Sequence, residues 1–551
     1  MKTIKLILVF IAAFITQAAM SQQQTVGIFL NTPEAFNGYT LFSPQLDTTT
    51  YLINNCGEVI NMWKSTRTPG RMAYLTTDGN LVRARATNNT VFKNGIAGGA
   101  IEIFNWEGEL IWDYFISDDF QCQHHDVEYL PNGNILAISW EYRTLEEVIQ
   151  VGRVNAQSEL WSEKIVEIQP DYENGGGTIV WEWRVWDHLI QDVDPNIANY
   201  GVVEDNPQRI DINYLAENAT IDWLHFNGID YNAELDQIVV SIHQFNEIWI
   251  IDHSTTTEEA ATSEGGNCGK GGDLLYRWGN PQAYKRGTES DRKLFLQHDP
   301  NWIPKGQLDG GMIMVYSNQA GTPYGLDYSS VVVIDPPLMD DGNYLFENAA
   351  YAPADAHWTY IAENPTDFYS AFFSGASRLP NNNTLICEAL TGRLFEVDYE
   401  GNIVWQYINP VGMNGITPQY EQPQSNSVFK TVRYAPDFEG FQGRELIPQG
   451  HIEPGTTTEC EIYSGTNVEK LYADGNFYVF PNPASSLLNV QWDYTNVDKI
   501  QITDMKGNLL IETPVYTNST VFDVSCFSEG VYIVSLMYKG YLVSSKQVVV
   551  R

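Results

Sequence analysis

Hydrophobic and polar residues alternate in short runs along most of the chain, and turn residues separate the runs. One phrase places an Asn- or Gly-rich turn between two β-rich runs, at residues 74–82, 127–137 and 376–386. Because Asn, Asp and Gly accept the positive φ angles of tight turns, each copy predicts a β-hairpin. No stretch shows convincing helical periodicity, so the pattern indicates an all-β protein.

A second phrase is a turn that feeds a strand ending in aromatic residues. It recurs at residues 56–63, 107–112, 177–183, 272–278 and 400–407. Such strands are expected at the outer edge of a sheet, where the ring covers the neighbouring sheet. Four-stranded sheets repeated in this way predict a β-propeller of about six blades over residues 22–449.

The two ends of the chain have different patterns. Residues 1–21 combine a basic start, a short apolar middle and small residues, which predicts a secretory signal peptide. No later segment is apolar enough to span a membrane. Residues 450–475 are polar and turn-rich, which predicts a linker. In residues 476–551 apolar and polar positions alternate in short runs, which predicts a small C-terminal β-sandwich.

Composition narrows the classes of partner. The formal net charge is −38 and no run of Lys or Arg occurs, which argues against nucleic acid and anionic membranes. The six cysteines permit disulfides but form no CxxC pair, so a structural zinc site is not expected. The acidic turns at residues 118–119 and 335–342 match no EF-hand spacing and are expected to be solvated.

Five of the nine histidines stand beside predicted hairpins or strands: His124, His125, His225, His243 and His298. Polar residues at corresponding ends of the first strands of different blades converge on the channel of a propeller. We therefore expect these imidazoles to gather in one funnel, which packing alone does not explain. The other four are expected to be solvated: His188, His253, His357 and His451.

The C-terminal phrases resemble the type A sorting domain of the type IX secretion system of Bacteroidota. They are Pro481-Asn-Pro483, Asp504-x-x-Gly507, Gly530-Val-Tyr532 and a basic residue followed by valines at the end. The resemblance implies export across both membranes, with the type IX machinery as a partner, and a protein that is secreted or attached to the cell surface.

Residues 25–445 resemble the arylsulfotransferase family of six-bladed propellers. The similarity lies in His-His-Asp ahead of Leu-Pro-Asn-Gly-Asn at 124–134, Asp-Trp-x-His-x-Asn at 222–227, Glu-Ile-Trp-Ile-Ile-Asp at 247–252 and Gln-His-Asp at 297–299. In that family a histidine at the Gln-His position attacks a phenolic sulfate ester. It forms a sulfohistidine and passes the sulfuryl group to an acceptor phenol.

The resemblance implies a role for each matching residue. His298 is the nucleophile, His225 and Asn227 hold sulfuryl oxygens or protonate the leaving oxygen, and one of His124 and His125 adds a donor, with His125 favoured. Neutral imidazole, imidazolium and an amide supply the nucleophile, the proton and the donors that such a transfer requires. The reaction needs no cofactor and takes a phenolic sulfate donor and a phenolic acceptor.

One departure from the family pattern leaves a second function possible. The family usually has an arginine shortly before Glu-Ile-Trp, where this chain has His243, whose charge depends on pH. Arg378, at the start of another hairpin, is a candidate replacement cation. Trp223, Trp302 and Trp405 are candidates for an aromatic pocket, although such rings are mostly packing. The alternative is a non-catalytic secreted propeller that binds a glycan or protein partner.

Overall fold

The computed structural model describes residues 23–93, 98–218, 220–347, 350–456, 459–463, 477–492, 497–504, 508–515, 517–538 and 541–551. The predicted signal peptide lies outside them.

Six antiparallel sheets form the blades of a propeller, which confirms the predicted all-β fold. From the channel outward, blade 1 has β31 (Val428–Tyr434), β2 (Tyr39–Pro44), β3 (Thr49–Ile53) and β4 (Val59–Lys64). Blade 2 has β5 (Pro69–Leu75), β6 (Leu81–Ala86), β7 (Gly99–Phe104) and β8 (Leu110–Phe115). Blade 3 has β9 (Gln121–Tyr129), β10 (Ile135–Arg143), β11 (Leu160–Pro170) and β12 (Gly177–Arg184).

The second half continues the pattern. Blade 4 has β15 (Phe226–Asn232), β16 (Gln237–Ile242), β17 (Glu247–Asp252) and β18 (Tyr276–Trp278). Blade 5 has β19 (His298–Trp302), β20 (Ile313–Ser317), β21 (Ser330–Ile334) and β24 (Trp358–Tyr360). Blade 6 has β25 (Gly375–Arg378), β26 (Thr384–Glu388), β27 (Arg393–Val397), β28 (Ile403–Ile408) and an outermost fifth strand, β1 (Gly27–Asn31).

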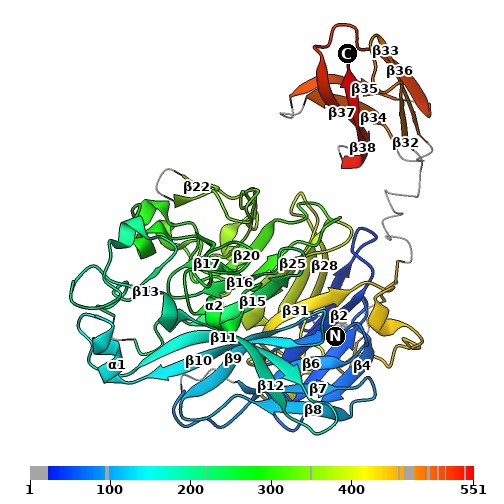
Figure 1. The fold of residues 1–551 in the computed structure, drawn as a ribbon. Helices are drawn as coiled ribbons and strands as arrows, with labels where there is room; N and C mark the ends of the chain where they lie inside the picture. Colours follow the sequence, from blue (N-terminus) through cyan, green and yellow to red (C-terminus); the bar gives the residue numbers. More distant parts are fainter. Residues whose placement is uncertain are drawn as a thin grey trace, which may run out of the picture.

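The ring is closed by strands from both ends of the propeller segment. The yellow strand β31 pairs with the blue strand β2 and completes blade 1 (Figure 1). At the other closure, β1 pairs with β28. The six inner strands contact one another in a closed circle, in the order β31, β5, β9, β15, β19, β25. Residues far apart in the sequence therefore meet at the channel.

Short elements fill the connections between blades. The helices α1 (Leu145–Gln150) and α2 (Thr257–Ala260) each begin with a capping box, in which a threonine and a glutamate satisfy each other's backbone N–H groups. The short strands are β13 (Leu189–Ile190), β14 (Ile210–Asp211), β22 (Phe346–Glu347), β23 (Ala350–Tyr351), β29 (Val411–Gly412) and β30 (Gly415–Ile416).

Five of the six inner strands carry a bulge. The pairing register shifts around residues 70–72 of β5, 124–126 of β9, 227–228 of β15, 299–300 of β19 and 429–430 of β31. A bulge leaves residues without a partner on the next strand and turns their side chains in new directions. Each of these inner strands therefore presents side chains to the channel that a regular strand would keep within the sheet.

An ion bridge in the channel joins all six blades. Nζ of Lys430 lies 2.9 Å from Oδ2 of Asp126 and 2.7 Å from Oδ1 of Asp299. Further donors to the two carboxylates come from the remaining blades: Tyr74 Oη and the backbone N–H of Ile229 to Asp126, and the N–H of Ala376 to Asp299. Burial alone would lower the pKa of Lys430, but the two carboxylates outweigh it and raise the pKa.

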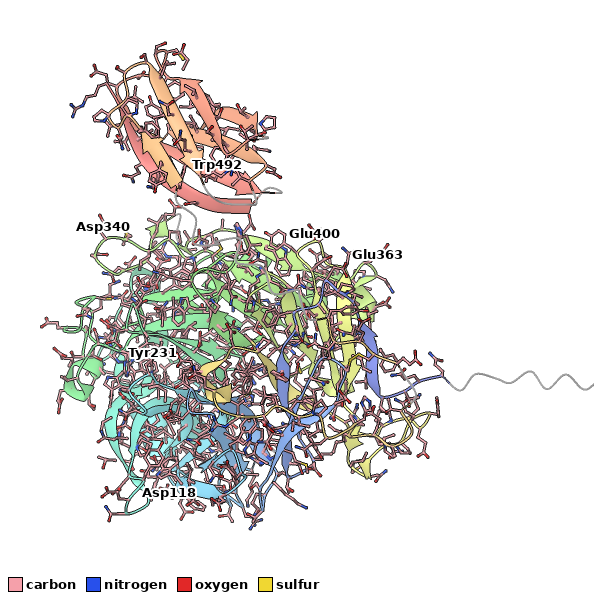
Figure 2. All side chains as sticks on the ribbon, turned by 90° about the vertical axis from the view of Figure 1, so that its right-hand side faces the viewer. Asp118, Tyr231, Asp340, Glu363, Glu400 and Trp492 are labelled. Atoms are coloured by element: carbon pink, nitrogen blue, oxygen red, sulfur yellow. A yellow bond between two sulfur atoms is a disulfide. The ribbon has the colours of Figure 1, made fainter. Side chains whose placement is uncertain are left out.

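The C-terminal segment forms its own two-sheet domain. One sheet has β32 (Phe477–Phe480), β33 (Leu487–Trp492) and β36 (Ser519–Asp523), and the other has β35 (Leu509–Pro514), β34 (Lys499–Asp504), β37 (Gly530–Tyr538) and β38 (Tyr541–Val550). Trp492, labelled in Figure 2, belongs to the separate apolar core of this domain.

The start of the predicted linker 450–475 lies against the propeller. The N–H of Val59 donates to the carbonyl of Gly450, and a disulfide joins Cys56 to Cys460. Cys122, Cys268, Cys387 and Cys526 are free. The predicted solvation of His188 is wrong: its buried ring lies between the carboxylate of Asp273 and a backbone carbonyl.

Removing the central lysine is expected to destabilise the propeller. Lys430→Met leaves two buried carboxylates without their counter-charge, which costs about 3–5 kcal/mol of unfolding free energy. Urea denaturation measures the change. Lys293→Met, which removes a largely exposed pair with Asp355, is the control and is expected to cost at most about 1 kcal/mol. Equal effects of the two substitutions would contradict this account of the channel.

Candidate active site

Four histidines form an arc at the channel. The ring centroids are 4.8 Å apart for His125 and His225, 5.1 Å for His225 and His243, and 5.3 Å for His243 and His298. The ring centroid of Phe429 lies 5.9 Å from that of His125 and 6.2 Å from that of His298, so Phe429 contacts both ends of the arc. The histidines come from blades 3, 4 and 5 and Phe429 from blade 1, so four of the five histidines that were expected to gather in one funnel do so.

Local backbone strain accompanies this arrangement. His125 and His225 have φ angles of 55° and 56°, Asp299 next to His298 has 54°, and Phe373 beside the arc has 62°. Side-chain-bearing residues adopt this left-handed region only at a cost, and such strain concentrates at functional sites. The bulges and their positive φ angles turn the side chains toward one another.

His298 has a defined tautomer. Asn318 donates its amide N–H groups to the carbonyls of Ser370 and Phe373, at 2.9 and 2.8 Å, so its Oδ1 faces His298 Nδ1 at 2.7 Å. His298 must therefore donate from Nδ1. Its Nε2 carries the lone pair and accepts the N–H of Phe373 at 3.2 Å. Burial lowers the pKa of His298 to about 3, so the ring is neutral.

His225 is the opposite case. Its Nδ1 lies 2.6 Å from Oδ2 of Asp222, whose other oxygen accepts the indole N–H of Trp140 at 3.0 Å. Burial would lower the pKa of His225, but the charge and hydrogen bond of Asp222 outweigh burial and raise it. The pKa of one histidine of the arc is lowered and that of another is raised, a separation typical of acid–base pairs in active sites.

His243 lies between these two rings. Burial and the neighbouring His225 and His298 hold its pKa well below the ordinary value. In the described part of the chain its Nδ1 has no hydrogen-bond partner. At the position where the family usually has arginine, this chain therefore holds a neutral imidazole.

Arg71, in the bulge of β5, supplies a cation that the sequence analysis missed. After burial, its charge also contributes to the lowered pKa of His125 and His298, and it opposes the rise in the pKa of His225. Burial lowers the pKa of Arg71 to about 10, so it stays charged at neutral pH. Its guanidinium stacks 4.5 Å from the ring of Phe373 and donates to Gln45 at 2.8 Å.

Two phenylalanines give the cluster an apolar side. Phe373 and Phe429 pack with ring centroids 5.5 Å apart, and Phe429 neighbours both ends of the histidine arc. The tryptophans considered from the sequence make other contacts. The indole N–H of Trp405 donates to the carbonyl of Asn55 at 2.8 Å, that of Trp223 donates to the carbonyl of Tyr214 at 3.0 Å, and Trp302 packs against the apolar cluster between blades 4 and 5.

His124 lies behind the arc. It is fully buried, stacks on Trp140 with centroids 4.0 Å apart, and contacts His125 and Glu163. His125, rather than His124, neighbours the other histidines of the arc. The residue pattern alone left this choice open.

Asn227 and Arg378 occupy other positions. Asn227 is buried in the bulge of β15 and donates its amide N–H to the carbonyl of Gln297 at 2.8 Å, which ties β15 to the segment before His298. Arg378 does not join the histidines. Its guanidinium is buried between Trp358 and Asp309, with Nη2 2.7 Å from Oδ2 of Asp309. Arg71 takes the place suggested for Arg378.

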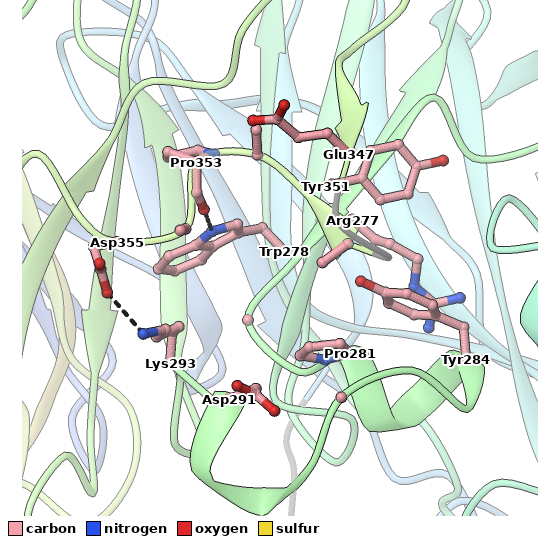
Figure 3. A pocket seen from close by; sticks show the side chains of 15 residues that line it. Arg277, Trp278, Pro281, Tyr284, Asp291, Lys293, Glu347, Tyr351, Pro353 and Asp355 are labelled. Atoms are coloured by element: carbon pink, nitrogen blue, oxygen red, sulfur yellow. Dashed lines mark hydrogen bonds and ion pairs between the residues drawn. The ribbon is translucent and has the colours of Figure 1, made fainter.

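A separate cavity of about 320 Å³ lies between blades 4 and 5. Figure 3 shows its aromatic wall, in which Trp278 donates its indole N–H to the carbonyl of Pro353, and an ion pair between Lys293 and Asp355. No residue of the histidine arc lines it.

The acidic turns lie on the surface. Asp118 and Asp340 are exposed and stand at the periphery in Figure 2. Among the described residues, no group of three or more His, Cys, Asp and Glu side chains has an arrangement that would hold a metal ion. In that same part of the chain, no helix has the length and apolar character needed to cross a membrane.

The fold and site define a six-bladed propeller with a histidine-rich channel. A family model described as Arylsulfotransferase (ASST) matches residues 47–408, and the chain belongs to this family. A model described as Secretion system C-terminal sorting domain matches residues 478–551. The C-terminal module thus directs type IX secretion to the cell surface or the exterior.

Solved structures include distant likenesses. A protein of unknown function from Bacteroides caccae is 13% identical with a TM-score of 0.39, over 72% of this chain and 98% of that chain. A streptogramin B lyase is 11% identical with a TM-score of 0.35, over 75% of this chain and 97% of that chain. Neither carries an argument about activity. A search of curated proteins finds no match.

The protonation of His225 is expected to depend on Asp222. Asp222→Asn removes the charge that raises the pKa of His225 and leaves the effect of burial, so the pKa falls below its ordinary value of about 6.5. NMR titration of the histidine rings measures it. Asp119→Asn, at an exposed turn, is the control and leaves the pKa unchanged. An unaltered pKa in Asp222→Asn would refute this assignment.

Proposed function

We propose that the protein transfers a sulfuryl group from a phenolic sulfate ester to a phenolic acceptor through a sulfohistidine on His298. The observation that carries the proposal is one buried arc that holds both His298, whose Nε2 lone pair is free of a proton, and His225, whose pKa Asp222 raises against the effect of burial. Family membership supports an arylsulfotransferase-like activity. The mechanism needs no cofactor.

In the first step Nε2 of His298 attacks the sulfur of the ester. The N–S bond forms while the bond between sulfur and the aryl oxygen breaks, and the electron pair leaves with that oxygen. His225 donates its Nε2 proton to the oxygen, so that the product leaves as a neutral phenol. Asn318 keeps the proton on Nδ1 of His298 throughout, and Arg71 attracts the sulfuryl oxygens.

In the second step the acceptor phenol reverses these roles. Its O–H proton passes to the now neutral His225 while its oxygen attacks sulfur, and the N–S bond breaks. His298 is neutral again and His225 is protonated again, so no external acid or base is consumed. Phe373 and Phe429 offer an apolar surface beside His298 for the aromatic ring of either phenol. Water in place of the phenol would give hydrolysis.

One observation favours the alternative of a non-catalytic propeller that binds a glycan or protein. The N–H of Phe373 points at Nε2 of His298, the atom that must attack. In the proposed reaction the substrate displaces this contact, whose 3.2 Å separation lies at the upper end of the normal range for a hydrogen bond. Turnover of an aryl sulfate separates the two functions.

Removing either histidine is expected to reduce turnover, but in different ways. His298→Ala abolishes transfer from every aryl sulfate, because no nucleophile remains. His225→Ala lowers kcat by about 100- to 10,000-fold for phenyl sulfate and by less for 4-nitrophenyl sulfate, whose phenolate needs little protonation. Steady-state assays with a phenol acceptor measure both. His357→Ala, at an exposed histidine, is the control. A fully active His298→Ala enzyme would exclude the proposal.

Arg71 is expected to contribute to binding of the sulfate group. A hydrogen bond to a charged group contributes about 1.5–3 kcal/mol, so Arg71→Ala raises KM for aryl sulfates about 10- to 150-fold. Arg71→Lys recovers part of the loss, because it restores the charge but not the planar fork. The same assay measures both variants. An unchanged KM in Arg71→Ala would show that the sulfate does not meet this side chain.

A further inference from the structure

A chain of hydrogen bonds runs from the arc into the wall of blade 3. Nδ1 of His125 lies 2.8 Å from Nδ1 of His124, and Nε2 of His124 lies 2.9 Å from Oε2 of Glu163. The three residues are 1%, 0% and 0% exposed. The ring of His124 stacks on the ring of Trp140, with the two centroids 4.0 Å apart. The chain is therefore rigid and shielded from water.

The geometry allows two arrangements of protons. Two imidazole nitrogens 2.8 Å apart must share one proton, because neither two lone pairs nor two N–H groups make a hydrogen bond. If Glu163 is ionised, His124 donates from Nε2 and His125 donates from Nδ1, which leaves a lone pair on Nε2 of His125. If Glu163 is protonated, each donor direction reverses and Nε2 of His125 carries a hydrogen.

The surroundings of Glu163 select between these arrangements. Its carboxyl group is fully buried and, among the described residues, forms no ion pair with a lysine or arginine, so an ionised carboxylate would lack a counter-charge. Burial and the charge of nearby Asp222 raise the pKa of Glu163 well above its usual range, against the opposing effects of the Phe226 N–H and His225. Burial also lowers the pKa of His124 to about 3 and that of His125 well below the ordinary value. Neither ring therefore takes a second proton, and the proton stays on the carboxyl group.

We propose that Glu163 holds a proton and, through His124, fixes His125 as the tautomer whose Nε2–H faces the arc and donates to the bound sulfate group. Glu163 and His124 are then positioning residues, and His125 is the donor that contacts the substrate. The identity of the anion rests on the proposed function. The tautomer itself does not, since it follows from contacts within the protein.

The position of the His125 ring suits its proposed role as a hydrogen-bond donor. Because Nδ1 is engaged with His124, Nε2 is the ring nitrogen left for a ligand, and the ring centroid of His225 lies 4.8 Å from that of His125. No hydrogen bond to Nε2 of His125 is seen within the described residues. An N–H from His125 joins the guanidinium of Arg71 and the protonated His225 as donors around one anion, whereas a lone pair there would repel its oxygens.

Two substitutions of Glu163 test the relay by activity. Glu163→Gln keeps both contacts, because its amide N–H donates to Nε2 of His124 while its oxygen accepts the N–H of Phe226 as Glu163 does now. Its kcat/KM is expected within about threefold of the wild type. Glu163→Leu provides no donor and is expected to lose about 100- to 1,000-fold, the usual effect of one lost oxyanion donor.

The decisive readout is the tautomer, measured by NMR on the full-length protein with ¹⁵N-labelled histidine and no substrate. The proposal predicts Nε2–H on His125 and Nδ1–H on His124, in the wild type and in Glu163→Gln alike. Nδ1–H on His125 in the wild type, or a reversal in Glu163→Gln, would overturn it. If no aryl sulfate is turned over while the predicted tautomers are found, the proposed function fails and the relay stands.

Discussion

The ion bridge of Lys430 with Asp126 and Asp299 is the interaction on which the rest of the channel depends. Its ammonium group joins blade 1 to blades 3 and 5, and hydrogen bonds to the same carboxylates bring in blades 2, 4 and 6. A propeller has no central core segment, so its blades must be held by contacts between inner strands. Here those contacts are made by buried charged groups, and each charge is paired with an opposite charge.

The same bulges that build the bridge also build the site. Asp126 and Asp299 directly follow His125 and His298, and Lys430 directly follows Phe429. Adjacent residues of an extended strand point in different directions, so the bulges of β9 and β19 each contribute one residue to the bridge and one to the histidine arc. The bulge of β31 contributes Lys430 to the bridge and Phe429 to the apolar side of the arc. The rigidity of the bridge holds rings from different blades at about 5 Å from one another, which lets Asp222 and burial separate their protonation states.

Hairpin turns and aromatic strand ends were sufficient to predict the propeller, because both are local signals. The gathering of His125, His225, His243 and His298 was also predictable, from their places beside predicted hairpins and strands. The sequence did not predict the roles of Arg71, Phe429 and Glu163. Their positions depend on bulges and on the pairing register between distant segments, and no local sequence pattern indicates either. Arg378 failed as the replacement cation for the same reason: its hairpin was recognised, but its partner Asp309 lies on another blade.

The central claim is that His298 becomes covalently sulfurylated, and mass spectrometry tests it most directly. The protein is incubated with 4-nitrophenyl sulfate in the absence of an acceptor, quenched at alkaline pH and digested, and the modified peptide is sequenced by fragmentation. The account predicts one added sulfuryl group on His298, which disappears when a phenol is added before quenching and is absent from His298→Ala. A sulfuryl group on another residue, or turnover without any modified histidine, would contradict it.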